Sequence, residues 1–269
     1  MVNLLFGLIG LFFSLGQAFA GEIMFEGYYR IEASGKSIGY TIQRFEYDAK
    51  SKTFESTSFL KIKMGDKLIQ ESLKGKSNDK FHPISYSYTS QVNEVVKGID
   101  ATFNGTIMKL KKNDGKKVID ETHKIPDGSF LSSFLVFVML QKKLPLNQAF
   151  KYSGIAEEEG AGYWGKAWLE SKEQKGKLTV FRVLNSFKGE EFISQLAAIA
   201  DPDPKEKDKY VKGEVLTTES PKQSLTTRLV ATPNLATEGH LVPNKILVSL
   251  FGAVPTGKVN VVTNPPKEN

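Results

Sequence analysis

Apolar and polar residues alternate along much of the chain after residue 21. Tyr29, Ile31 and Ala33 are separated by charged residues, and the alternation resumes over residues 38–42, after a turn at residues 34–36. A period of two residues is typical of a strand with one apolar and one polar face, and the Gly in this turn tolerates positive φ. The segment therefore predicts a β-hairpin.

The same alternation and the same kind of turn recur along both halves of the chain. Many short strands joined by tight turns are typical of a meander, a sandwich or a barrel. Residues 233–243 are expected to be irregular, and Asn244–Leu250 is expected to form a last strand or a short helix. The further predicted strands are Phe54–Met64, Lys67–Leu73, Ile84–Tyr88, Val92–Phe103, Thr106–Lys111, Lys117–His123, Phe150–Ile155, Gly162–Leu169, Leu178–Phe187, Glu190–Ile199, Tyr210–Thr218 and Leu225–Ala231.

One segment in mid-chain breaks this pattern. Residues 130–140 are apolar except for Ser132 and Ser133, with a helix-start signal at residues 126–129 and Pro145 as a stop. We expect a helix of about 14 residues, buried on most sides, although a buried strand at Phe134–Leu140 is the alternative. The predicted fold is mainly β: a curved antiparallel sheet, a half-barrel or an open barrel, with one apolar helix against its concave face.

The first 20 residues predict export. They carry no charged side chain, contain an apolar stretch of about a dozen residues and end in Ala18-Phe19-Ala20, which suits a signal peptidase. Cleavage would leave Gly21 as the N-terminus and no transmembrane anchor, whereas an uncleaved anchor is the alternative. Residues 21–262 are predicted to form a single β-rich domain, with any boundary near 126–146, and residues 263–269 a flexible tail.

Composition narrows the setting and the partners. The chain has no cysteine, which excludes disulfides and a lipidated cysteine, and an exported protein without cysteine favours a bacterial periplasm. Its net charge of +6 comes from lysines scattered among acidic residues, as on a solvated surface or a face that meets anionic lipid. Nucleic acid is not an expected partner, because stacking platforms of aromatic residues and Arg are missing.

No catalytic or metal-binding pattern stands out. The three histidines, His82, His123 and His240, have no partner at metal-ligand spacing, and no serine-nucleophile elbow is present. The acidic clusters at residues 157–160 and 201–203 are expected to be solvated loops, with a weak cation contact as the alternative. We therefore predict neither enzymatic activity, nor catalytic residues, nor a cofactor, nor a metal.

Aromatic residues on the predicted strands suggest a ligand surface. They either fill a β core or line a hydrophobic lumen within a curved sheet, because both arrangements use the same side chains. For the second case we predict a lining on the concave face made of Tyr40, Ile42, Tyr86, Tyr88, Phe134 and Phe137.

Two stretches resemble an uncharacterised family of bacterial periplasmic β-domains. The opening hairpin, residues 29–40, has the family's strand–Gly–x–x–x–Gly–strand start, and Asp127 with Leu131-Ser132-Ser133 resembles its mid-chain helix. That family is similar in architecture to the Lol-type lipoprotein carriers. The resemblance implies a curved half-barrel with a helix in the concavity, and binding of acyl chains or a hydrophobic partner. Lipid handling carries over only as an analogy of shape.

These observations predict an exported, non-enzymatic binding module. Its concave apolar face would receive a lipid, an acylated protein or a hydrophobic peptide. The alternatives are a cell-envelope scaffold that binds a protein partner and no small ligand, and a hydrolase with a dispersed acidic site.

Overall fold

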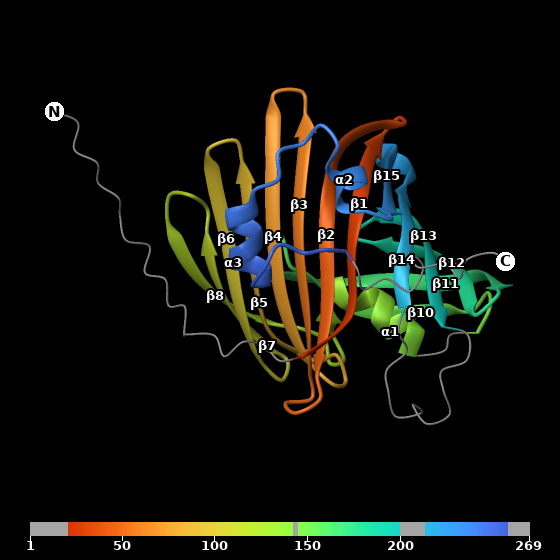
Figure 1. Cartoon of the computed structure of the whole chain (residues 1–269). Helices are drawn as coiled ribbons and strands as arrows, with labels where there is room; N and C mark the ends of the chain where they lie inside the picture. The colour runs from red at the N-terminus through yellow and green to blue at the C-terminus, as the bar shows by residue number, and fades with distance from the viewer. Residues whose placement is uncertain (1–20, 142–144, 200–212, 258–269) are drawn as a thin grey trace.

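The computed structural model describes residues 21–141, 145–199 and 213–257, whose 15 strands form one continuous, curved β-sheet (Figure 1). The strand order is β8-β7-β6-β5-β4-β3-β2-β1-β15-β14-β13-β12-β11-β10-β9. Neighbouring strands are antiparallel except β9 and β10, which pair in parallel. The expected mainly β fold with an open, curved antiparallel sheet is confirmed.

Eight consecutive strands form the first part of the sheet, and seven form the second. Two residues at positive φ, Ser34 at 48° and Gly35 at 77°, turn β1 back onto β2, as the hairpin prediction requires. The first eight strands are β1 Glu22–Ala33, β2 Lys36–Asp48, β3 Thr53–Met64, β4 Lys67–Asn78, β5 Pro83–Val92, β6 Val95–Asn104, β7 Ile107–Asn113 and β8 Val118–Lys124. The others are β9 Phe130–Leu131, β10 Ala149–Ala156, β11 Ala161–Lys175, β12 Leu178–Phe187, β13 Glu190–Ile199, β14 Gly213–Ser220 and β15 Leu225–Val230.

The mid-chain helix lies inside the curve of the sheet, as expected, but it is shorter than predicted. Helix α1 spans Leu135–Gln141, and three of its four buried residues, Phe137, Val138 and Met139, belong to the core on the concave face. Residues 130–131 form β9 instead, and Ser132–Phe134 form a single 3-10 turn. The helix begins late because Phe130 and Leu131 pair with β10, a contact between distant segments that local periodicity does not reveal.

A second, smaller core covers the convex face. It consists of Tyr28, Tyr40, Ile42 and Phe59 from the strands, with Ala236, Leu247 and Phe251 from the C-terminal segment, residues 233–257. This segment contains α2, Pro233–Thr237, and α3, Asn244–Phe251, which lie across the near side of the sheet in Figure 1. The expected irregular stretch at 233–243 thus includes a short helix, and the last element is a helix.

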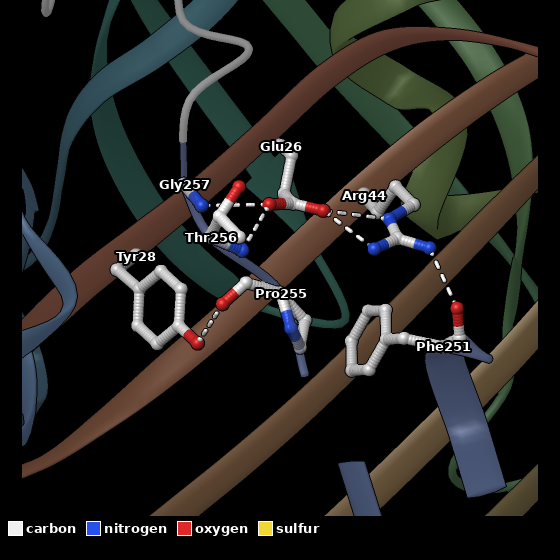
Figure 2. Close-up of polar contacts among 7 residues, drawn as sticks. All are labelled: Glu26, Tyr28, Arg44, Phe251, Pro255, Thr256 and Gly257. Atoms are coloured by element: carbon white, nitrogen blue, oxygen red, sulfur yellow. Dashed lines mark hydrogen bonds and ion pairs between the residues drawn. The ribbon is translucent and has the colours of Figure 1, made fainter. Parts of the chain in front are cut away.

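A buried polar cluster fastens the end of the C-terminal segment to the sheet (Figure 2). One carboxylate oxygen of Glu26 accepts the backbone N–H groups of Thr256 and Gly257, at 2.7 and 2.6 Å. The other accepts the Arg44 guanidinium at 2.6 and 2.8 Å, and Arg44 also donates to the Phe251 carbonyl at 2.8 Å. Each polar group of this ion pair therefore has hydrogen-bond partners, and these offset the cost of removing the two charges from water.

Some expectations concern other parts of the chain. The predicted signal peptide, residues 1–20, the loop at 201–203 and the tail at 263–269 lie outside the described residues. The predicted strand at 210–218 is described only from Gly213, where β14 begins. Within the described part of the chain, no helix combines the length and the hydropathy that a membrane crossing requires.

Candidate ligand-binding cavity

A cavity of about 1000 Å³ lies within the curve of the sheet, between its two halves. Strands β1–β5, β10 and β12–β15 and helix α1 contribute to its wall. Ligand pockets in proteins usually measure about 300–1,000 Å³, so this volume suits a small organic molecule. Its apolar lining residues are Phe25, Tyr29, Ile31, Phe45, Leu60, Leu73, Tyr88, Leu135, Val136, Phe137, Tyr152, Phe187, Phe192 and Val215.

The turn between β10 and β11 brings the two halves together. Gly160, at a φ of 67°, lies so close to β7 that an added Cβ would be 3.0 Å from side-chain atoms of Leu110 and of Lys112. A larger residue would require these side chains to shift and would hold its own backbone at a φ that glycine tolerates best. The three residues before this glycine, Glu157, Glu158 and Glu159, line the cavity.

Part of the cavity wall is apolar. Helix α1 contributes Leu135, Val136 and Phe137, and the Phe137 ring lies 4.5 Å from that of Phe45 on β2. Phe134 packs 6.0 Å from the same Phe45 ring and is fully buried. This part of the wall offers an apolar surface to an acyl chain or another apolar group, and the Glu157 carboxylate lies beside it, at the 3-10 turn that precedes α1.

Glu157 is buried in the cavity wall, with 2% of its surface exposed. Its carboxylate accepts a hydrogen bond of 2.6 Å from the Ser132 hydroxyl and one of 3.1 Å from the Ser133 backbone N–H. Burial raises the pKa of Glu157, and the bonds from Ser132 and Ser133 oppose that rise. The expectation that residues 157–160 form a solvated loop is wrong for Glu157, because its partners lie in another segment.

Glu71 on β4 is the second perturbed carboxyl group of the cavity. Burial raises its pKa, and the negative charge of Glu158 adds to the rise, while hydrogen bonds with Tyr88 and Ser90 oppose it. Burial likewise raises the pKa of Tyr88, and so does its contact with Glu71. The cavity lining thus holds two carboxyl groups, those of Glu71 and Glu158, that lie close enough to repel each other.

Lys188 is the one cation among the described lining residues. It is paired with both Glu158 and Glu159. Burial alone would lower the pKa of Lys188, but hydrogen bonds with these two carboxylates overcome that effect and raise it. Glu159 also accepts a hydrogen bond from the Tyr163 hydroxyl. The positive charge of Lys188 is therefore already paired with carboxylates of the protein itself.

Tyr29 presents an unsatisfied hydroxyl at the cavity. Its side chain lines the cavity, the residue is 1% exposed, and its hydroxyl has no hydrogen-bond partner within the described part of the chain. Burial raises the pKa of Tyr29 well above its usual value, and the charge of Glu214 adds to this. A buried hydroxyl without a partner costs about 1–3 kcal/mol, so a group that completed its bonding would be favoured here.

The structure brings together four of the six predicted lining residues. Tyr88 and Phe137 line the cavity, and Tyr86 and Phe134 are buried in the adjoining concave core. Tyr40 and Ile42 point to the opposite side of β2, where they are fully buried beneath the C-terminal segment.

The alternation on β2 could not tell the two faces apart. The odd-numbered residues Thr41, Gln43 and Phe45 face the cavity, and both faces of this strand are covered. Sequence reasoning also missed the charged residues of the lining. The run of three glutamates before Gly160 was the available signal, and its position in a turn suggested exposure.

Comparison with known proteins defines the fold. No known family profile matches the chain, and no curated protein matches it. Its structure resembles the crystal structure of a beta-barrel-like protein of the domain of unknown function DUF1849 from Brucella abortus. The TM-score is 0.53 at 10% sequence identity, over 76% of this chain and 94% of the other. The likeness is one of fold.

The likeness agrees with the expectation of an uncharacterised β family. Its description names neither a ligand nor an enzymatic activity. Among the described residues, no group of three or more potential ligating side chains is placed to hold a metal ion. The chemistry of the cavity therefore has to be argued from its own residues.

Proposed function

We propose that this chain is an exported, non-enzymatic binding module that holds one amphiphilic molecule in the cavity of its curved sheet. The observation that carries the proposal is the cavity itself, about 1000 Å³ with both an apolar surface, which α1 helps to form, and polar and charged groups in its lining. Such a combination suits a ligand with an apolar tail and a polar head. The sequence predicts a likeness in architecture to Lol-type carriers, and such an architecture would suit this use.

Burial of the tail would supply most of the affinity. Each CH₂ group that leaves water contributes about 0.8 kcal/mol, so a chain of moderate length binds without any covalent step. The signal-like segment at residues 1–20 supports an envelope location, with a mature protein that begins at Gly21. The mass of the protein recovered from the periplasm tests this cleavage, and native mass spectrometry of the same sample would reveal a co-purifying ligand.

A neutral fluorescent probe tests the cavity directly. N-phenyl-1-naphthylamine brightens in apolar surroundings, and we expect the native protein to bind it saturably. Val136→Trp puts an indole into the lining at α1 and should weaken binding by about tenfold or more. The matched control is Val248→Trp, on helix α3 of the convex face, where the native residue is 47% exposed.

Two results would contradict the proposal. The first is a native protein, folded by circular dichroism, that shows no saturable rise in fluorescence. The second is equal binding by both tryptophan variants. Either would favour the envelope scaffold, in which the concavity serves only as packing for α1.

A further inference from the structure

The charges of this protein are segregated between its inside and its outside. The whole chain carries a net charge of +6, yet the cavity lining holds six glutamates and a single lysine among the described residues. The basic surplus therefore lies elsewhere than in the cavity lining. The six acidic lining residues are Glu71, Glu157, Glu158, Glu159, Glu190 and Glu214.

The single lysine does not balance this charge. Lys188 is bound to Glu158 and Glu159, and one positive charge shared between two carboxylates leaves the trio negative. Lys112 lies close enough to stabilise the charged form of Glu159, but it is itself paired with Glu121 at 2.9 Å. A deficit of positive charge thus remains at the wall.

Two carboxyl groups of the cavity lining mark the place of the deficit. Glu71 on β4 and Glu158 in the β10–β11 turn both line the cavity and repel each other, and their negative charges add to the rise that burial causes in the pKa of Tyr88. A cation between these strands would favour both charged carboxylates, whereas an anion would add to the repulsion.

A second observation, separate from the count of acidic residues, also indicates that the cavity binds a ligand. The Tyr29 hydroxyl is buried at the cavity wall with no hydrogen-bond partner within the described residues. Its oxygen can accept a hydrogen bond from an N–H donor, and its proton can go to a ligand oxygen. A ligand with such groups would remove the cost of leaving this hydroxyl unsatisfied.

We propose that the cavity selects a positively charged amphiphile, with an apolar tail against α1 and a protonated amine beside Glu71 and Glu158. This inference rests on the proposed binding function and names the class of its ligand. The net charge of the protein cannot produce such a preference, because a chain of charge +6 attracts anions at long range.

Two ligands of equal tail length separate charge from hydrophobicity. Dodecylammonium and dodecanoate would compete with bound N-phenyl-1-naphthylamine at pH 7 and 0.15 M salt, below the concentrations at which either forms micelles. We expect dodecylammonium to displace the probe at a concentration about tenfold lower, or less, because an ammonium–carboxylate pair in a partly desolvated site supplies that difference. Equal displacement, or a preference for dodecanoate, would overturn the inference.

Variants locate the preference. Glu71→Gln with Glu158→Gln removes two charges from the wall and should abolish most of the preference, while binding of the neutral probe changes less than about twofold. The control is Glu94→Gln with Glu191→Gln, two exposed glutamates outside the cavity lining, which should keep the native preference. A double cavity variant that binds the probe and keeps the full preference would contradict the assignment.

A single substitution keeps the inference testable if the double variant Glu71→Gln with Glu158→Gln does not fold. The side chain of Glu158 is 42% exposed, so Glu158→Gln tests the same wall with less disturbance and should reduce the preference in part. The outcomes for the two proposals remain distinct. A native protein that does not bind the neutral probe defeats the binding function, and one that binds it without preferring the amine defeats only this inference.

Discussion

At the scale of single residues, Glu157 shows what the fold does to a carboxyl group. Its charge is taken out of water, and hydrogen bonds from the Ser132 hydroxyl and the Ser133 N–H compensate only in part, so its pKa is raised from the usual 4.5. The folded protein then holds this proton more tightly than the unfolded chain does. Stability from Glu157 is fully present below pH 4.5 and is lost as the pH rises towards the raised pKa.

Glu157→Gln should remove this pH dependence. The amide can keep both hydrogen bonds, since its oxygen accepts from the Ser133 N–H and its nitrogen donates to the Ser132 hydroxyl. From pH 4.5 upwards, the native protein should lose stability relative to the variant, by at most about 1.4 kcal/mol per pH unit. Urea unfolding at several pH values measures the difference.

The control for this experiment is Glu94→Gln, in the exposed turn between β5 and β6, which should follow the native curve. A Glu157→Gln variant whose stability runs parallel to the native protein from pH 4.5 to 8 would show that Glu157 takes up no proton on folding.

At the scale of elements, the sequence determined the strands better than their faces. Period-two alternation located the hairpins because each strand has its own local pattern and each turn its own glycine or polar residues. It could not assign Tyr40 and Ile42 to a face, because the C-terminal segment buries the convex side of the same strand. The late start of α1 depends on β9 pairing with β10, which is likewise non-local.

The attachment of the C-terminal segment leads to a prediction about Glu26. Glu26→Gln replaces an oxygen that accepts hydrogen bonds with a nitrogen that donates them, and leaves the Arg44 guanidinium buried without its counter-charge. Breaking a buried pair in this way costs about 3–5 kcal/mol. Chemical denaturation should show a loss of this order, and trypsin should cut after Lys245 faster than in the native protein.

A matched variant on the same segment separates burial from charge. Glu238→Gln breaks the ion pair between Glu238 and Arg30. Because the Glu238 side chain is 72% exposed, this should lower the free energy of unfolding by about 0–1 kcal/mol. Equal losses in the two variants would mean that the Glu26–Arg44 pair contributes no more than a surface contact.

At the scale of the whole molecule, the fold class was predictable, and the strand pairing that joins the two halves of the sheet was not. The number of strands, the turns and the single apolar helix together indicate a curved sheet around that helix. The pairing of β1 with β15, in which Tyr28 lies opposite Val230, joins segments that are far apart in the chain and leaves no local pattern. The cavity lies between the two halves that this pairing joins, so its volume and its acidic lining emerge only from the structure.

The continuous sheet predicts that the chain unfolds as one unit. Both tryptophans, Trp164 and Trp168, lie on β11, so their fluorescence reports on the second half of the sheet, whereas far-ultraviolet circular dichroism reports on all of it. The concave core joins side chains from both halves, such as Phe54 on β3 and Leu196 on β13. We therefore expect the two signals to give coincident urea transitions. Two midpoints would instead place a domain boundary in the chain, near the region 126–146 where the sequence pattern changes.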